Sequence, residues 1–167
     1  MGRLEGRTAM VTGASRGIGK AIALAFAAEG ADVVATARTT NAVDAVIGQC
    51  RQMGRDGLAV TADLSIEKDI QRVADEALRK FARLDIVVNN AAIIHPHMNL
   101  VDFAADLWRQ VIEVNLIGPA LLTKAVLPEM IKNRSGKIIN ISSIGGRKGG
   151  KGRSAYRAAK AGLISLT

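Results

Sequence analysis

The sequence predicts an α/β fold, a three-layer and doubly wound parallel sheet of about five strands. Short apolar runs alternate with longer amphipathic segments along the chain, which is the pattern of parallel strands joined by helical crossovers. A glycine-rich turn, Thr12–Gly19, separates the first apolar run from the first amphipathic segment. The chain has 167 residues and is 49% hydrophobic, so we expect one domain, residues 1–167, with a sizeable core.

The glycine-rich turn follows a short predicted strand, Ala9–Val11, and opens a helix that runs to about Glu29, where Gly30 ends it. Glycine tolerates positive φ and lets a ligand approach the backbone, and the free N–H groups of a helix N-terminus attract anions. The turn therefore predicts a cradle for the pyrophosphate of a dinucleotide, although such glycines also occur in plain turns. The predicted cradle residues are Gly13, Ser15, Arg16, Gly17, Ile18 and Gly19.

The second predicted strand, Val33–Ala37, is followed directly by Arg38. Dinucleotide sites that select the unphosphorylated cofactor carry an acidic residue near this strand end, about 20 residues beyond the glycines. Arg38 and Arg16 would instead pair with a 2′-phosphate through charge-assisted hydrogen bonds. The sequence therefore favours NADP(H) over NAD(H) as the cofactor, with solvated surface arginines as the alternative.

The third and fourth predicted strands both end in polar residues. A helix over 42–53 leads to the strand Leu58–Ala62, which ends at Asp63. Asp63 has two interpretations: it caps the next helix, which runs to about Phe81, or it contacts the adenine of a cofactor. The fourth strand, Asp85–Asn89, is nearly all apolar, as a sheet covered on both faces requires.

Small and polar residues follow the fourth strand. Asn90 and Ala91 allow close approach of a ligand at the carboxyl end of the sheet, where ligands bind in this architecture. His95 and His97 lie in the same loop. Because no third ligand stands at a suitable spacing, we expect no metal site, and the two histidines are interpreted as facing a substrate or as simply exposed.

Residues 103–133 predict one or two long helices, which Pro119 and Pro128 are expected to kink or divide. Asn115 is a polar residue in an apolar stretch of this segment. Such an asparagine either bonds locally and distorts the helix or has a catalytic role.

The fifth predicted strand, Lys137–Ser143, carries Ser142 and Ser143 at its carboxyl end. Strand-end serines are often only turn formers. A last helix opens with Tyr156 and Lys160, whose i, i+4 spacing places the phenol and the ammonium on one face. A lysine close to a tyrosine favours the phenolate, so the pair is typical of an acid–base site, although the spacing alone is common.

Charge and composition exclude several classes of function. The net charge of +8 suits a polyanionic partner, but aromatic residues make up only 3% of the chain and the basic residues are spread along it, so no nucleic-acid partner is expected. The one local concentration is a glycine-rich loop, either a solvated segment or a clamp for an acidic substrate or carrier. Its basic residues are Arg147, Lys148, Lys151 and Arg153.

The single cysteine, Cys50, excludes an internal disulfide and suits a reducing compartment. The N-terminus has no apolar signal core, and no run reaches the ~18 apolar residues of a membrane span. We therefore expect a cytoplasmic protein that is neither secreted nor inserted in a membrane.

Together these features resemble the short-chain dehydrogenase/reductase family, and the resemblance covers nearly the whole chain. Thr12–Gly19 matches the family's TGxxxGxG cofactor turn, and Asn89-Asn90-Ala91 matches its NNAG motif, from which Ala92 departs. The resemblance implies a Rossmann-like sheet with strand order 3-2-1-4-5 and cofactor contacts from Asp63, Leu64, Asn90 and Ala91. The loss of the motif's glycine is expected to be mild if residue 92 avoids positive φ.

By resemblance, the family's catalytic tetrad falls on Asn115, Ser143, Tyr156 and Lys160. Tyr156 would then protonate the carbonyl oxygen that Ser143 binds, and Lys160 would lower the tyrosine's proton affinity and hold the nicotinamide ribose, so that Tyr156 and Lys160 also count as cofactor contacts. Asn115 would position a water that relays protons to Lys160.

The resemblance implies an NADP(H)-dependent oxidoreductase that acts on a carbonyl or secondary alcohol, close to the 3-oxoacyl-acyl-carrier-protein reductases or the sugar-acid dehydrogenases. Complete members continue through two further strands, so the chain is expected to be C-terminally incomplete. The alternative is a catalytically silent cofactor-binding or interaction module. A small-molecule or carrier-bound carbonyl substrate and a homo-oligomer formed through the long helices are the expected partners.

Overall fold

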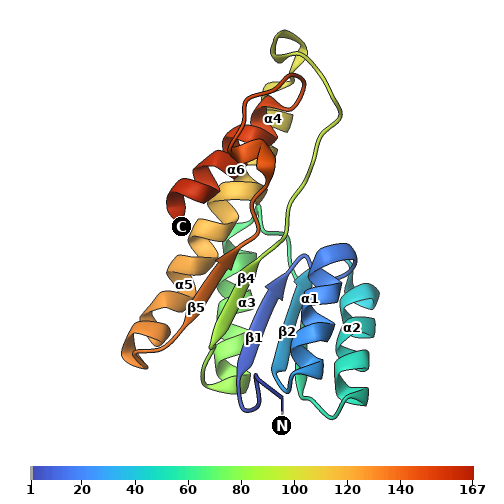
Figure 1. The fold of residues 1–167 in the computed structure, drawn as a ribbon, viewed down its shortest axis with the longest axis vertical. Coiled ribbons are helices and arrows are strands. Elements are labelled where there is room, and N and C mark those ends of the chain that lie inside the picture. The colour runs from blue at the N-terminus through green and yellow to red at the C-terminus, as the bar shows by residue number, and fades with distance from the viewer. Residues whose placement is uncertain (1) are drawn as a thin grey trace.

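Five short apolar segments form one parallel sheet in a computed structural model of the protein, which describes residues 2–167. The sheet has the order β3-β2-β1-β4-β5, and all four ladders are parallel, so β1 lies at its centre (Figure 1). The predicted fold class and strand order are confirmed. The strands are β1 (Thr8–Thr12), β2 (Asp32–Ala37), β3 (Gly57–Thr61), β4 (Ile86–Asn89) and β5 (Lys137–Asn140).

Six α-helices connect and cover these strands: α1 (Gly17–Ala28), α2 (Thr40–Gln52), α3 (Glu67–Phe81), α4 (Ala105–Ile112), α5 (Gly118–Lys132) and α6 (Ser154–Leu166). Helices α1 and α2 cover one face of the sheet, and α3 and α5 cover the other (Figure 1). Alternation along β1 explains both layers, because Met10 faces the α3 and α5 side while Val11 faces the α1 and α2 side. The strands are therefore apolar on both faces, as predicted.

The helix that follows the glycine turn ends where the sequence predicts. Gly30 has φ +97°, and its N–H donates to the carbonyl of Ala27 at 3.0 Å. Glycine adopts this left-handed conformation without steric cost, so it closes α1 and turns the chain into β2.

One of the two interpretations of Asp63 is excluded, and two boundary predictions are wrong. Helix α3 begins at Glu67 with Ile66 as its N-cap, so Asp63 does not cap it. The fifth strand ends at Asn140 instead of Ser143, because its ladder partner β4 ends at Asn89. The long helical segment is interrupted by a π-helical turn, Glu113–Ile117, and continues through Pro128.

The division of the long segment is the turn Glu113–Ile117, directly before Pro119, whose missing N–H leaves a carbonyl of that turn without its helical partner. Pro128 does not divide α5 because it is exposed, so water can serve the carbonyl that it leaves unpaired. The whole run Ala105–Lys132 is long and apolar enough to pass a length-and-composition test for a membrane span. Core helices pass the same test, and Leu122, Val126 and Met130 of this run pack in the core.

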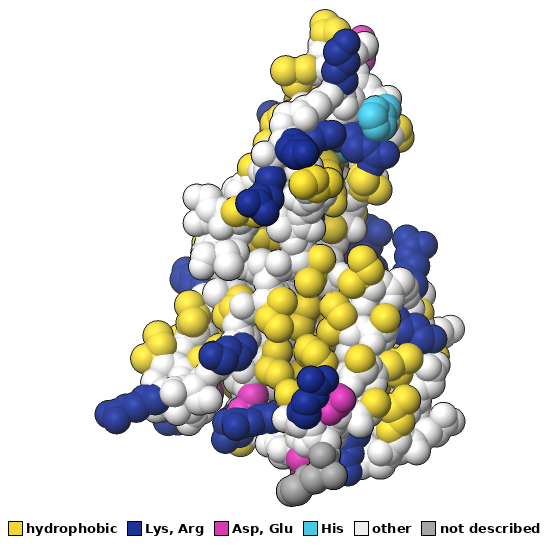
Figure 2. All heavy atoms as spheres, in the orientation of Figure 1, with side chains coloured by type: hydrophobic (Ala, Val, Ile, Leu, Met, Phe, Trp, Pro, Cys, Tyr) yellow, Lys and Arg dark blue, Asp and Glu magenta, His cyan; other side chains and the backbone are white. Residues whose placement is uncertain are grey.

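β5 is an edge strand of the sheet. On the side of α1, Val88 of β4 is buried, but apolar side chains of β5 and its neighbours are only partly covered among the described residues, and Figure 2 shows apolar side chains gathered on this face. Ile139 of β5 is 40% exposed, and Ile86 and Ile141 are half-buried. This face of the sheet at β5 is therefore partly exposed to solvent in residues 2–167.

Candidate active site

The turn between β1 and α1 lies so close to the chain after β4 that only glycine fits at the points of contact. Gly13 and Gly17 have φ of +65° and +56°. A Cβ on Gly13 would lie 2.8 Å from the Cα of Ala91, and a Cβ on Gly19 would lie 2.4 Å from the carbonyl oxygen of Gly13. Both contacts are with backbone, so these two glycines are required by the packing of the turn.

Thr12 joins the same two segments by hydrogen bonds. Its Oγ1 accepts from the N–H of Asn90 and from that of Ala91, both at 3.0 Å. A further hydrogen bond runs in the opposite direction, because Nδ2 of the Asn90 side chain donates to the carbonyl of Thr12 at 2.9 Å. Sequence reasoning missed this function of Thr12; a threonine at the buried end of the central strand was the available signal.

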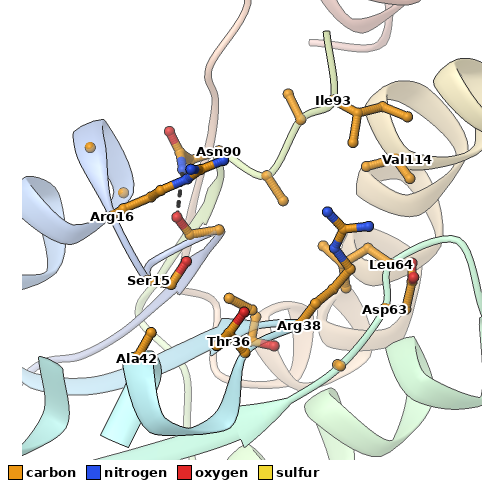
Figure 3. Close-up of a pocket in the computed structure, with 18 of the residues that line it drawn as sticks. Ser15, Arg16, Thr36, Arg38, Ala42, Asp63, Leu64, Asn90, Ile93 and Val114 are labelled. Carbon is orange, nitrogen blue, oxygen red and sulfur yellow. Dashed lines mark hydrogen bonds between the residues drawn. The ribbon is translucent and has the colours of Figure 1, made fainter. Parts of the chain in front are cut away.

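A cavity of about 710 Å³ opens at the carboxyl ends of the strands, beside this turn (Figure 3). It brings together the eleven cofactor residues predicted from the turn and the strand ends: Gly13, Ser15, Arg16, Gly17, Ile18, Gly19, Arg38, Asp63, Leu64, Asn90 and Ala91. Tyr156 and Lys160 do not line it. Sequence reasoning missed further lining residues, including Thr36, Ile93 and Val114.

Two arginines reach the cavity from different sides (Figure 3). Arg16 comes from the glycine turn and lies near Asn90, whereas Arg38 extends from the end of β2 into the cavity. Asp63 lies at the rim, where its Oδ1 accepts from the N–H of Ser65 at 2.9 Å and from the Ser65 hydroxyl at 2.7 Å. Asp63 thus closes a local turn after β3 and is not a helix cap.

Two observations show that the cavity fits the phosphates of a dinucleotide. The first turn of α1 contains no acidic residue, and no side chain caps its N–H groups, so this helix end is electropositive and open to an anion. The hydroxyl of Thr36, which lines the cavity, is buried without a hydrogen-bond partner among the described residues. A buried polar group of this kind is normally satisfied by a ligand or water.

Tyr156 and Lys160 lie one turn apart on α6, and the Lys160 Nζ is 6.0 Å from the centre of the Tyr156 ring. Lys160 is only 2% exposed, and its Nζ donates to the carbonyl of Ile141 at 2.6 Å. Burial lowers the pKa of Lys160, because desolvation disfavours the charged amine. The pair therefore combines a half-buried phenol with an amine that has been taken out of water.

The two serines after β5 have different partners. Ser142 donates its hydroxyl to the carbonyl of Lys160 at 2.9 Å, which ties this segment to α6. Ser143 Oγ accepts from the N–H of Gly145 at 3.1 Å and donates to no described residue. A serine whose proton is uncommitted can donate it to a substrate oxygen, so this arrangement suits the assignment of Ser143.

Asn115 lies in the π-helical turn and is completely buried. Both ends of its amide bind the main chain of Ile93: Oδ1 accepts from the N–H and Nδ2 donates to the carbonyl, each at 2.8 Å. The side chain therefore lies in a helix distortion, as one interpretation of the sequence expected, but it bonds the distant loop after β4 and not its own helix. Its catalytic role, to position a water that relays protons to Lys160, stays a prediction.

The loop after β4 avoids the strain that Ala92 could have caused. Among residues 2–167, the non-glycine residues with positive φ are Ala82 and Arg134, so Ala92 has an ordinary backbone conformation. His95 is buried with its ring edge-on to Phe103 at 4.6 Å, whereas His97 is exposed. No three His, Cys, Asp or Glu side chains of the described part are placed to hold a metal ion.

The sheet order, the glycine turn and the cavity at the strand ends define a dinucleotide-binding protein of the Rossmann type. The family model for the short chain dehydrogenases matches residues 7–167. The chain therefore belongs to the short-chain dehydrogenase family, whose members include oxidoreductases.

Individual relatives agree with this assignment. The chain is 44% identical over 168 residues to a 3-oxoacyl-acyl-carrier-protein reductase of Synechocystis, covering 100% of this chain and 68% of the relative. It is 40% identical over 163 residues to the Escherichia coli reductase of that name, covering 98% and 65%. The chain thus spans about two thirds of the length of these relatives.

Two solved structures share the fold. A metagenomic short-chain oxidoreductase in complex with NADP has a TM-score of 0.93 at 40% identity, covering 98% of this chain and 74% of that one. An NAD+-bound xylitol dehydrogenase has a TM-score of 0.94 at 29% identity, covering 99% and 64%. Members of the same fold therefore bind either nicotinamide cofactor.

Proposed function

We propose that this chain is the cofactor-binding and catalytic part of an NADP(H)-dependent oxidoreductase, which transfers a hydride between nicotinamide and a carbonyl or secondary-alcohol carbon. The observation that supports this most directly is the position of Arg38. It extends into the cavity from the end of β2, where a site selective for NAD(H) carries an acidic residue (Figure 3).

Arg38 and Arg16 support NADP(H) as the cofactor. A guanidinium binds a phosphate through two parallel hydrogen bonds, and two of them would neutralise most of the charge of a 2′-phosphate. Since one solved relative binds NADP and another binds NAD+, membership of the family does not decide the cofactor. The two arginines that line the cavity are the observation that supports NADP(H).

The residues of α6 and the preceding loop support acid–base chemistry at a carbonyl. When bound, a reduced nicotinamide supplies the hydride that adds to the carbonyl carbon. Tyr156 gives its phenolic proton to the carbonyl oxygen, and Ser143 donates a hydrogen bond to that oxygen as its charge develops. Lys160 uses one N–H for Ile141 and keeps two donors for the cofactor ribose and the phenolate. The product is the secondary alcohol.

The substrate that the relatives favour is a 3-oxoacyl thioester, because the curated relatives with 38–44% identity are 3-oxoacyl-acyl-carrier-protein reductases. A sugar-acid or polyol substrate is the alternative, and the xylitol dehydrogenase likeness favours it. Two further basic residues, Lys132 and Arg134, lie near the amino end of β5, far from the loop before α6 (Figure 1). A single chain therefore does not combine them with that loop in one carrier-binding patch.

We also propose a homo-oligomer formed through the long helices, in the cytoplasm. Apolar side chains on the outer surface of this segment favour such an interface: Ile117 and Leu127 are each 37% exposed, and Ile131 is 70% exposed.

A second candidate is a catalytically silent cofactor-binding module. It is favoured by one observation: Tyr156 and Lys160 stand outside the cavity that the predicted cofactor residues line. In that case the cradle binds a nucleotide and no carbonyl is reduced.

One experiment separates the candidates. The purified chain is titrated with NADPH and NADH by fluorescence, and reduction of an acetoacetyl thioester is measured with the Tyr156→Phe variant as the blank. Preference for NADPH that falls about tenfold in Arg38→Ala, together with turnover lost in Tyr156→Phe, is the expected result. NADPH binding without turnover would establish the silent module, and no binding of either nucleotide would overturn both candidates.

A further inference from the structure

The positive charge of the protein is concentrated in its last part. The 38 residues from Met130 to Thr167 contain no Asp or Glu, and they contain nine basic residues: Lys132, Arg134, Lys137, Arg147, Lys148, Lys151, Arg153, Arg157 and Lys160. Four of these lie in the loop 147–153 between β5 and α6, which we call the cationic loop. Figure 2 shows Lys and Arg side chains gathered on the part of the molecule that carries α4 and α6 in Figure 1.

The charges of the cationic loop are not neutralised by the protein. In the part of the chain that the structure describes, none of its four basic side chains forms an ion pair. Arg147, Lys148 and Lys151 are exposed, and Arg153 is half-buried. Four like charges within seven residues repel one another, so a bound anion would stabilise them.

The backbone of the cationic loop is held at three points, unlike that of a freely solvated segment. Arg157 Nη1 donates to the carbonyls of Lys148 at 2.7 Å and Gly149 at 3.2 Å. The N–H of Lys148 donates to the carbonyl of Ile144 at 3.2 Å, and the carbonyl of Gly152 accepts from the N–H of Met98 at 3.1 Å. The carbonyls of Lys148, Gly149 and Gly152 therefore accept hydrogen bonds from the rest of the protein, while the basic side chains of the loop form no ion pairs among the described residues.

Gly145 and Gly150 allow the chain around the cationic loop to pack closely against the side chain of Arg157. A Cβ on Gly150 would lie 2.5 Å from Nη2 of Arg157, and the Cγ of Arg157 is 3.4 Å from the Cβ position of Gly145. Arg157 therefore fills the space under the loop, and its charge faces carbonyls and not a carboxylate.

The cationic loop stands next to the residues proposed for catalysis. It leads directly into α6, which begins at Ser154 and carries Tyr156 in its first turn. At its other end, the turn Ile144–Gly146 packs against α6, and a Cβ on Gly146 would lie 2.7 Å from the carbonyl of Lys160. The cationic loop therefore lies between Ser143 and Tyr156 in the sequence, so a substrate bound at both residues lies near the two ends of the loop.

We propose that the cationic loop is an anion subsite that determines specificity, and that it binds a phosphate group of the substrate, with Arg157 as the positioning residue that fixes its shape. This inference rests on the proposed function, because it takes the substrate carbonyl to be placed at Tyr156. A preorganised set of unpaired cations binds an anion without first breaking ion pairs or ordering a loop. The substrate class is therefore a carbonyl compound with a phosphate-bearing handle.

The test compares two thioesters with the same acyl group. Acetoacetyl-coenzyme A carries phosphates, and acetoacetyl-N-acetylcysteamine carries none. In the triple variant Arg147→Gln, Lys148→Gln, Lys151→Gln, KM for the coenzyme A thioester is expected to rise about tenfold or more, since each charge-assisted contact is worth that order. KM for the uncharged thioester and kcat for both are expected to stay unchanged. Removing three exposed charges elsewhere, with Lys68→Gln, Arg79→Gln and Lys124→Gln, is the matched control.

A binding measurement does not depend on turnover. Inorganic pyrophosphate is titrated by calorimetry into a chain whose cofactor cradle is disabled by Arg16→Ala and Arg38→Ala, with and without the triple variant. Loss of pyrophosphate binding with the triple variant supports the subsite even if no thioester is reduced. Equal pyrophosphate affinities overturn the proposal, as do equal changes in KM for both thioesters. Binding of an acidic carrier protein without binding of pyrophosphate would also overturn it.

The positioning role of Arg157 has its own readout. Trypsin cleaves after Lys and Arg, so its rate of cleavage within residues 147–153 reports whether the loop is held. Arg157→Ala is expected to speed this cleavage and to raise KM only for the phosphate-bearing thioester, and Arg157→Lys is expected to rescue part of both effects. If Arg157→Ala alters both thioesters equally, Arg157 only stabilises the fold.

Discussion

The amide of Asn115 and the main chain of Ile93 are joined by two hydrogen bonds, from the Ile93 N–H to Oδ1 and from Nδ2 to the Ile93 carbonyl, both 2.8 Å long. Asn115 belongs to the π-helical turn, whereas Ile93 lies in the loop after β4 and lines the cavity. The bonds therefore connect the distortion in the long helix to the wall of the cofactor site.

Asn115→Ala is expected to lower the free energy of unfolding by about 1–3 kcal/mol, because it leaves the N–H and the carbonyl of Ile93 without partners. NADPH affinity is expected to fall as well, since Ile93 lines the cavity. Urea unfolding and NADPH titration measure the two effects. Asn133→Ala removes an exposed asparagine from the end of the same segment and is expected to change stability by less than about 0.5 kcal/mol. Equal stabilities of the two variants would contradict the role of the Ile93 bonds.

Alanine substitutions at Gly6 and Gly13 distinguish the cost of backbone strain from the cost of a steric clash, because the two glycines have similar backbone conformations. Gly13 has φ +65° and Gly6 has φ +72°, but a Cβ on Gly13 meets Ala91 Cα at 2.8 Å, whereas a Cβ on Gly6 meets nothing within 4 Å. Gly6→Ala is expected to cost about 1 kcal/mol of stability and to leave NADPH affinity unchanged. Gly13→Ala is expected to abolish NADPH binding, as measured by fluorescence titration. Retention of NADPH binding by Gly13→Ala would refute the cradle geometry.

The element types were predictable because they follow from local pattern. Each strand is a short apolar run, and the central strands β1 and β2 are buried on both faces. Helices place their apolar residues at helical spacing, as in Ile70, Val73, Ala74 and Ala77 of α3. The rule that ligands bind at the carboxyl ends of parallel strands then located the glycine turn, Arg38, Asp63 and Asn90 at one cavity.

The errors arise where tertiary contacts override local signals. Asp63 looks like a helix cap, but Asp69 accepts the Asp63 N–H through its Oδ2 at 2.8 Å, and the Asp63 carboxylate binds Ser65 instead. Thr36 and Val114 come from stretches whose sequence is ordinary for a strand and a helix. Only the assembled sheet and the π-helical turn bring them to the cavity, so no local pattern marks them.

Substitution by valine is expected to affect the stability of the free protein differently at Thr36 and at Thr12. Both are 1% exposed, but the Thr36 hydroxyl has no partner among the described residues, while the Thr12 hydroxyl binds the N–H groups of Asn90 and Ala91. Thr36→Val is expected to leave the free energy of unfolding unchanged or higher and to weaken NADPH binding several-fold, and Thr12→Val is expected to lose about 1–3 kcal/mol. Urea unfolding without cofactor and NADPH titration test the pair. Destabilisation of the free protein by Thr36→Val would show that its hydroxyl is already satisfied by the protein.

Burial of Lys160 makes stability depend on pH in a defined direction. The amine is 2% exposed, and burial lowers its pKa below the ordinary value of 10.5. Between the folded and the unfolded pKa, the unfolded chain binds more protons than the folded chain, so the free energy of unfolding rises with pH in that window. Lys160→Met keeps the length of the side chain and removes this titration.

The wild-type protein is therefore expected to gain stability relative to Lys160→Met as the pH rises toward 10.5, which urea unfolding at a series of pH values measures. The same substitution at Lys124, which is exposed on α5, is the control, and its stability difference from the wild type is expected to be independent of pH over this range. A wild-type to Lys160→Met difference that does not vary with pH would mean that the amine is as well solvated in the folded chain as in the unfolded one. In that case Lys160 could not act as a desolvated partner of Tyr156.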